Sequence, residues 1–160
     1  MERAEPPIVS VLVTTRDNER HVAVAMASVL RQTVADLELL VVDDGSRDST
    51  ADVLESINDP RLSVTRAEES AGISVRRNEL VERAHGRFIA PLDADDVWFP
   101  DRLARTIGVL ESRPDLVVVG SDVVVVDDGT RAGPYFRLPR SDAAIRWACL
   151  FTSPLIHTAC

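Results

Sequence analysis

The sequence predicts an α/β fold in which helices cover both faces of a mostly parallel sheet. Short apolar runs alternate with segments of helical periodicity, and this alternation is typical of parallel sheets. Two of the runs, residues 37–42 (LELLVV) and 88–92 (FIAPL), end directly at acidic clusters, residues 43–46 (DDGS) and 93–96 (DADD). Open α/β sheets bind ligands at the carboxyl ends of their strands. The clusters therefore predict one site for a cation and a phosphorylated ligand.

Three strands and two helices are predicted before residue 70. Val22, Met26 and Val29 recur with helical spacing and form one apolar face. Residues 46–49 carry side chains that favour a helix N-terminus, and Pro60 follows the end of that second helix. In chain order the predicted elements are a strand over residues 8–13, a helix over 22–30, a strand over 37–42, a helix over 50–57 and a strand over 62–65.

The remaining chain predicts a further strand of the sheet between two longer helices. Leu80, Val81 and Ala84 mark the inner side of the third helix, and Gly86 stands at a C′ position that ends it. Pro100 is placed to begin the fourth helix. The predicted elements are a helix over residues 74–84, a strand over 88–92, a helix carrying Leu103, Ile107 and Leu110, β-branched runs at 116–119 and 123–126, a hairpin-type turn at Asp128–Gly129 and a short helix over 142–150.

Composition limits the class of protein. A chain of 160 residues with 45% hydrophobic and 28% charged residues is ordinary for one soluble globular domain. The net charge of −8 argues against a nucleic-acid partner and against a generic anionic membrane surface. No stretch approaches the roughly 20 apolar residues of a membrane span, and residues 1–5 do not lead into a signal peptide. Cys149 and Cys160 lack metal-ligand spacing, so we expect reduced thiols in a cytoplasmic protein.

The cluster Asp93-Ala94-Asp95-Asp96 can be read in two ways. Mg²⁺ prefers carboxylate oxygens and usually takes only one or two of them, together with water and substrate phosphate. An Asp-x-Asp at a strand end could supply that sparse ligand set, and the metal would stabilise a departing diphosphate. The alternative is that these are turn carboxylates ahead of the helix at Pro100. Spacing alone leaves both interpretations open.

The cluster Asp43-Asp44-Gly45-Ser46 is similarly ambiguous. A carboxylate at the end of a buried strand can accept hydrogen bonds from a base N–H or a ribose hydroxyl. In the alternative, Asp44 or Ser46 caps the next helix within a simple βα turn. We expect Ser46 to be a cap, and spacing leaves Asp43 and Asp44 undecided.

Two further features have both a structural and a functional interpretation. Arg76 and Arg77 could bind phosphate or a base, but most helix arginines are solvated or pair with a neighbour such as Glu79. Trp98 could stack on a ligand, although a place in the core is the more common role. The sequence contains no Gly-x-Gly-x-x-Gly or P-loop motif and no His/Cys spacing for zinc.

Five segments match one known pattern in order and spacing. They are residues 9–15 (VSVLVTT), 27–33 (ASVLRQT), 39–50 (LLVVDDGSRDST), 72–78 (GISVRRN) and 84–96 (AHGRFIAPLDADD). Together they resemble the family-2 nucleotide-sugar glycosyltransferases of the GT-A fold, over residues 8–129. The resemblance implies a Rossmann-like, three-layer α/β/α architecture with a mostly parallel sheet.

The resemblance also implies a role for individual side chains. Thr14, Thr15 and Asp17 would line the base pocket. Either Asp43 or Asp44 would hydrogen-bond a uracil-type base. The implied nucleotide-binding residues are Thr14, Thr15, Asp17, Asp43, Asp44, Arg77 (base or diphosphate) and Asp93 (ribose side), and the implied ligand of Mn²⁺ or Mg²⁺ is Asp95.

The implied reaction is transfer of a hexosyl-type sugar, with inversion, from a nucleotide sugar to an acceptor hydroxyl. A carboxylate base deprotonates the acceptor while the metal stabilises the leaving nucleoside diphosphate. UDP is the commonest nucleotide of the family. The implied acceptor is a carbohydrate or a lipid-linked sugar of cell-surface polysaccharide or glycoconjugate synthesis, at or near the inner membrane face.

The sequence departs from the family in three places. Proline is usual where Thr14 stands, and Tyr-Asn is usual where Arg16-Asp17 stands. The family's catalytic base falls beyond the position of Cys160. We therefore expect residues 1–7 to be an N-terminal extension, residues 8–130 the nucleotide-sugar-binding core, and residues 131–160 the incomplete start of the acceptor side, in a fragment or truncated gene product.

Three other functions remain as alternatives. A nucleotide-sugar-binding fragment without a catalytic base would bind donor and transfer nothing. An α/β protein that forms a homo-oligomer through residues 117–126 and the apolar tail would bind no nucleotide. A nucleotidyltransferase is disfavoured because residues 14–19 lack the glycine-rich loop of that class.

Overall fold

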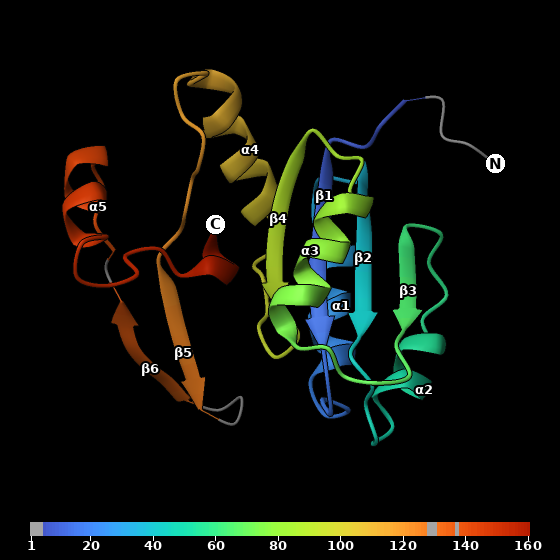
Figure 1. Ribbon diagram of the computed structural model, residues 1–160. Helices are drawn as coiled ribbons and strands as arrows, with labels where there is room; N and C mark the ends of the chain where they lie inside the picture. Colours follow the sequence, from blue (N-terminus) through green and yellow to red (C-terminus); the bar gives the residue numbers. More distant parts are fainter. Residues whose placement is uncertain (1–4, 128–130, 137) are drawn as a thin grey trace.

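The computed structural model describes residues 5–127, 131–136 and 138–160. Its centre is a four-stranded parallel sheet in the order β3-β2-β1-β4 (Figure 1). Strands and helices alternate as the sequence predicts. The elements are β1 Val9–Thr15, α1 Val22–Leu30, β2 Leu37–Asp43, α2 Thr50–Glu55, β3 Leu62–Arg66, α3 Ile73–Arg83, β4 Phe88–Asp93 and α4 Arg102–Ser112.

Helices cover both faces of this sheet, because its central strands are apolar on both sides. One face buries alternate residues of β1, such as Val11 and Val13, against α1, α2 and α4. The other face buries Leu12 and Val42 against Leu80 of α3. Figure 1 shows α3 in front of β1 and β2, with α1 behind them. Each large aliphatic side chain buried in this way contributes roughly 1.5–3 kcal/mol.

Strand order fixes where the sheet changes direction. From β1 the chain moves outward to β2 and β3, and then returns across β1 to β4. The crossover from β1 to β2 and the crossover from β3 to β4 therefore run in opposite directions along the sheet, and the switch point lies between β1 and β4. Ligands of open α/β sheets bind beyond the carboxyl ends of the strands at such a point.

The amino edge of the sheet is closed by a hydrogen-bond network. The hydroxyl of Ser10 donates to Glu38 Oε1 over 2.5 Å, and the backbone N–H of His85 donates to the same oxygen over 2.8 Å. The N–H of Gly86 donates to Ser10 Oγ over 2.8 Å. A Cβ at position 86 would lie 2.3 Å from the Ser10 nitrogen. Gly86 is thus needed for close approach to β1, and the predicted C′ role is wrong because α3 is capped at Ala84.

The residues after α4 form a separate two-stranded sheet and two short helical elements. β5 Val123–Asp127 and β6 Arg131–Phe136 pair antiparallel, followed by α5 Asp142–Ala148 and a 3-10 turn, η1 His157–Ala159. The predicted turn residues Asp128 and Gly129 lie outside the described part of the chain. The β-branched run 116–119 is not a strand, and Val117 is 96% exposed. No helix in the described ranges is long and apolar enough to cross a membrane.

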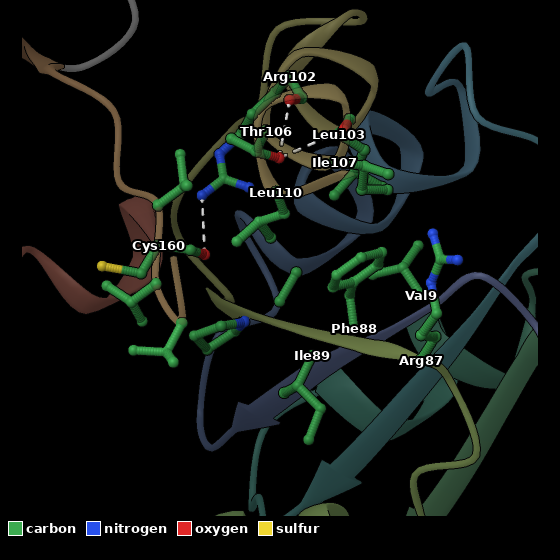
Figure 2. Close-up of a pocket in the computed structure, with 15 residues that line it drawn as sticks. Val9, Arg87, Phe88, Ile89, Arg102, Leu103, Thr106, Ile107, Leu110 and Cys160 are labelled. Atoms are coloured by element: carbon green, nitrogen blue, oxygen red, sulfur yellow. Dashed lines mark hydrogen bonds between the residues drawn. The ribbon is translucent and has the colours of Figure 1, made fainter. Parts of the chain in front are cut away.

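Residues 158–160 pack beside the edge strand β4 and contact Trp98 and Arg102. Trp98 is buried, as the core interpretation predicts, and the Arg102 guanidinium lies 4.1 Å from its ring centroid. Arg102 Nη2 donates to the backbone oxygen of Thr158 over 3.3 Å and to that of Cys160 over 3.0 Å. Figure 2 shows the bond to Cys160. Burial lowers the pKa of Arg102 to about 10.

A cavity of about 480 Å³ lies between β4, α4 and residues 117–119. Figure 2 shows Arg102 at one side of it and Phe88 and Ile89 at the other. The β4 residues that line it belong to the first part of the strand, so this cavity is separate from the acidic edge at Asp93.

Candidate functional site

The carboxyl edge of the sheet brings together side chains from three strands. Thr15 at the end of β1 is in register with Asp43 at the end of β2, and Thr14 is in register with Asp93 at the end of β4. Because neighbouring residues in register point to the same face, Thr15 and Asp43 share the α1–α2 face. Thr14 and Asp93 share the face that α3 covers. Residues predicted from separate motifs thus meet at the switch point.

Arg77 reaches this edge from α3. Its Nη2 donates to Asp93 Oδ1 over 2.7 Å, and the two side chains are 30% and 37% exposed. An ion pair of this exposure contributes little to stability. It leaves a guanidinium, which binds phosphate or carboxylate in the same planar geometry, at the mouth of the site.

Asp43 is buried, and only one of its two carboxylate oxygens accepts hydrogen bonds from the described part of the chain. Its Oδ1 accepts from the backbone N–H of Ser46 over 3.0 Å and from the Ser46 hydroxyl. Within the described residues, Asp43 Oδ2 has no hydrogen-bond partner, and neither do the buried hydroxyls of Thr14 and Thr15. Buried polar atoms without partners are rare and call for a physical explanation such as a bound group. Here the three atoms lie where two neighbouring strands end.

The expected N-cap role of Ser46 is wrong. Helix α2 begins at Thr50 with Ser49 in the N-cap position. The Ser49 side chain makes no cap hydrogen bond, and Asp48 Oδ1 accepts from the N–H of Thr50 over 2.9 Å instead. The Ser46 hydroxyl instead faces Asp43 and also accepts from the backbone N–H of Asp17 over 2.9 Å. The Ser46 hydroxyl therefore links the end of β2 to the loop at Asp17.

Asp44 makes four hydrogen bonds with the segment that leads into α3. Oδ1 accepts from the N–H of Ala71 over 2.8 Å and from Arg76 Nε over 2.7 Å. Oδ2 accepts from the Ser70 hydroxyl over 2.6 Å and from the N–H of Gly72 over 3.0 Å. Burial opposes ionisation, but the bonds from Ser70, Arg76, Ala71 and Gly72 outweigh it and hold the pKa of Asp44 well below its usual range.

The β1–α1 and β2–α2 loops are joined by reciprocal hydrogen bonds. Asp17 Oδ1 accepts from the N–H of Arg47 over 2.7 Å, and Asn18 N–H donates to the Thr50 hydroxyl over 2.7 Å. Glu19 N–H donates to Asp48 Oδ2 over 3.0 Å. Asp17 has a φ of 49°, an uncommon conformation for a residue with a side chain. These contacts hold Asp17 near the edge, on the rim of a hollow of about 230 Å³ lined by residues 17–21 and Asp48.

Asp95 and Asp96 lie in an exposed turn directly after β4. The N–H of Asp96 donates to the carbonyl of Asp93 over 3.0 Å and closes this turn. No group of three or more metal-binding side chains occurs in the described ranges. One or two exposed carboxylates beside a phosphate site nevertheless fit a Mg²⁺- or Mn²⁺-type ion, which completes its shell with water and ligand oxygens.

Sequence reasoning identified the residues of the edge and the pairing of Arg76 with Glu79, but it missed the contacts that support the edge. Ser70, Arg76 and Thr50 each hold a predicted residue or its loop in place. Their partners lie 26–32 residues away along the chain. Local spacing carries no signal for such pairs, although the run of hydroxyl and acidic residues at 46–50 indicates a hydrogen-bonded loop.

The strand order, the helices on both faces and the acidic carboxyl edge define an α/β protein of the GT-A fold class. A crystal structure of S. aureus TarS 1-349 in complex with UDP-GlcNAc matches 66% of this chain and 32% of its own, with 27% identity and a TM-score of 0.62. The mannosyltransferase PcManGT from Pyrobaculum calidifontis, in complex with GDP-Man and Mn²⁺, matches 67% of this chain and 33% of its own, with 26% identity and a TM-score of 0.60.

The chain belongs to glycosyl transferase family 2, whose family model matches residues 10–156. The putative teichuronic acid biosynthesis glycosyltransferase TuaG of Bacillus subtilis is 33% identical over 137 residues, 84% of this chain and 54% of TuaG. The UDP-Glc:alpha-D-GlcNAc-diphosphoundecaprenol beta-1,3-glucosyltransferase WfgD of Escherichia coli is 36% identical over 103 residues, 64% of this chain and 41% of WfgD. The chain therefore spans about half the length, or less, of these relatives.

Proposed function

We propose that this chain forms the donor-binding part of an inverting glycosyltransferase. The donor is a nucleoside-diphosphate sugar, most simply a UDP-sugar, and the acceptor is a hydroxyl of a carbohydrate or lipid-linked sugar. The product belongs to cell-surface polysaccharide or glycoconjugate synthesis, in the cytoplasm at the inner membrane face. The glycosyltransferase functions of TuaG and WfgD and the UDP-GlcNAc bound to TarS support this class.

One observation carries the proposal. The polar atoms that lack hydrogen-bond partners in the described residues and the partly exposed Arg77–Asp93 pair lie at the same switch-point edge. A nucleotide offers what this edge lacks. Its base supplies N–H donors for Asp43 Oδ2, and its diphosphate supplies anionic oxygens for Arg77. Because Asp43 Oδ2 is buried, donation to it requires the residues that cover it to shift. The ribose hydroxyls are then placed to donate to Asp93.

We assign the base side of the site to Asp43, Thr14, Thr15 and Asp17. Asp43 is the better of the two adjacent acids for direct contact, since it retains a free acceptor oxygen. All four lone-pair directions of Asp44 are already taken by protein donors. Asp44 therefore contributes to nucleotide binding indirectly.

We propose Asp95 as the protein ligand of Mn²⁺ or Mg²⁺. When bound, the ion would neutralise the diphosphate and stabilise it as a leaving group. The exposed carboxylate of Asp95 fits an ion that takes few protein ligands. We assign no residue of this chain as the base that deprotonates the acceptor.

Calorimetric titration of the 160-residue chain with UDP, with and without Mn²⁺, tests the proposal. We expect binding that Mn²⁺ strengthens, and loss of that enhancement in Asp95→Asn. Asp115→Asn is the matched control, because it removes an exposed carboxylate that pairs with the nearby Arg113. If a folded sample binds no UDP under either condition, the proposal is wrong. Donor binding without transfer to any acceptor would support the alternative of a non-catalytic nucleotide-sugar-binding fragment.

Light scattering of the same sample tests the remaining alternative. A chain that binds UDP as a monomer excludes the α/β protein that associates through residues 117–126 and binds no nucleotide. A homo-oligomer that also binds UDP would leave the donor site intact and add a subunit interface to it.

A further inference from the structure

We infer that Asp44 is a positioning residue, which orients Arg77 through the start of α3 without touching the nucleotide. The inference rests on the proposed function, because it concerns the same donor site. It begins from the bonds that occupy Asp44: Ser70, Ala71, Gly72 and Arg76 all donate to one buried carboxylate. Asp44, the acid directly after β2, is thereby joined to the N-terminus of the helix that carries Arg77.

The connection is tight because the segment before α3 is held at two points. The N–H of Ala67 donates to the carbonyl of Asp43 over 2.9 Å, and Asp44 holds residues 70–72. Gly45 lies against this segment: a Cβ there would stand 3.2 Å from the Ser70 nitrogen, and its φ is 72°. Gly72, with a φ of 89°, then turns the chain into the helix. The starting point of α3 is therefore fixed relative to β2.

The rotation of α3 about its axis is set by Arg76. All three of its guanidinium nitrogens are engaged: Nε by Asp44, Nη1 by Glu79 over 2.9 Å, and Nη2 by the carbonyl of Glu69 over 2.8 Å. Successive residues of a helix point about 100° apart. Once Arg76 is held against Asp44, Arg77 is directed toward the end of β4, where it meets Asp93.

The two adjacent arginines thus have different tasks. Arg76 is 14% exposed, and each of its three guanidinium nitrogens has a hydrogen-bond partner. Arg77 is 30% exposed and pairs with Asp93, which is 37% exposed. Arg76 therefore holds the start of α3 in place, and Arg77 remains available to a ligand. The ionised state of Asp44 matters for this arrangement, because a neutral carboxyl would lose acceptor capacity toward four donors.

A double-mutant cycle on UDP binding in the presence of Mn²⁺ tests the inference. In Asp44→Asn the amide nitrogen faces donors, so the start of α3 loosens, and we expect affinity to fall about tenfold. In the Arg77→Gln background the same change should have less than about a twofold effect, because the residue through which Asp44 acts is already gone. A purely structural role, or a direct contact, would give a full Asp44→Asn effect in both backgrounds and overturn the inference.

Nucleotide selectivity gives a second readout. A positioning residue weakens UDP and GDP by the same factor, whereas loss of a direct base contact changes their ratio; a changed ratio would contradict the inference. If Asp44→Asn does not fold, Arg76→Lys carries the same test, because it keeps the charge and loses the planar fork. Failure of the unmodified chain to bind UDP would refute the proposed function, whereas an unaltered Asp44→Asn affinity beside a binding parent would refute only this inference.

Discussion

The two ends of the same parallel strands are built in opposite ways. At the amino edge, Ser10, Glu38 and the N–H groups of His85 and Gly86 satisfy one another in a closed network. At the carboxyl edge, Asp43 Oδ2 and two threonine hydroxyls are buried without protein partners among the described residues. One end of the sheet thus satisfies its own polar groups, whereas the other, in the part of the chain that the structure describes, leaves polar atoms without protein partners, as the proposed donor site requires. Changes at the two ends should therefore separate stability from binding.

The largest expected effect is on stability at the amino edge. Gly86→Ala places a Cβ about where the Ser10 backbone lies, and we expect the free energy of unfolding to fall by roughly 3 kcal/mol. UDP affinity of the remaining folded protein should be unchanged. Gly108→Ala is the matched control: nothing lies within 4 Å of its Cβ, and in mid-helix the change should stabilise by about 0.5–1 kcal/mol. Urea unfolding measures both, and equal effects would contradict the close approach at Gly86.

At the carboxyl edge the expected effect is on binding. Arg77→Gln removes a half-exposed cation, and the unfolding free energy should change by less than about 0.5 kcal/mol. We expect UDP affinity to fall about tenfold, or roughly 1.4 kcal/mol, because a charge-assisted contact with the diphosphate is lost. Arg105→Gln, which removes an exposed helix pair with Asp101, serves as the control. Calorimetry that showed equal affinities for parent and Arg77→Gln would exclude Arg77 from the site.

Asp43 sharpens the comparison because it belongs to the core and to the site. In Asp43→Asn the amide oxygen still accepts from Ser46, and the amide nitrogen replaces the unpartnered Oδ2. We expect a stability change within about 1 kcal/mol, together with several-fold weaker UDP binding, since the acceptor for a base N–H has become a donor. Thermal unfolding with and without UDP measures both quantities. A variant that binds UDP as well as the parent would move the base contact away from Asp43.

The smallest expected effect is a dependence on pH at the amino edge. Burial opposes ionisation of Glu38, but hydrogen bonds from Ser10 and His85 prevail and lower its pKa below 4.5. A lowered folded-state pKa contributes stability above the unfolded value, and that stability is lost as pH falls through the folded value. The unfolding temperatures of the parent and Glu38→Gln should therefore differ at pH 7 and converge below about pH 4.5. A difference in unfolding temperature between the two proteins that stays constant down to acid pH would contradict an ionised Glu38 in this network.

Sequence reasoning located most elements because their signals are local. Apolar runs predicted β2 and β4, and helical spacing predicted α1 and α4. Strand β1 extends two residues beyond the prediction, to Thr15, because it continues to pair with Asp43 of β2. Val81 was expected on the inner side of α3 and is 49% exposed, since the helix turns Leu80 toward the sheet. Pairing across the fold decides such details, and local propensity does not.

The same distinction applies to the site. The acidic clusters and their place at strand ends were readable from the sequence, as was the family. The different roles proposed for Asp43 and Asp44 could not be predicted from the sequence. They depend on Ser70 and Arg76, which lie 26 and 32 residues from Asp44. The Arg77–Asp93 pair likewise joins residues 16 apart on different elements.

The paired loops at residues 16–20 and 46–50 have a practical consequence for redesign. Each donates backbone N–H groups to side chains of the other, through Asp17, Asp48 and Glu19. A loop transplanted alone from a relative would arrive with the wrong acceptors for its neighbour. Chimeras intended to exchange donor preference must therefore carry both loops together, as one cassette divided by a helix and a strand.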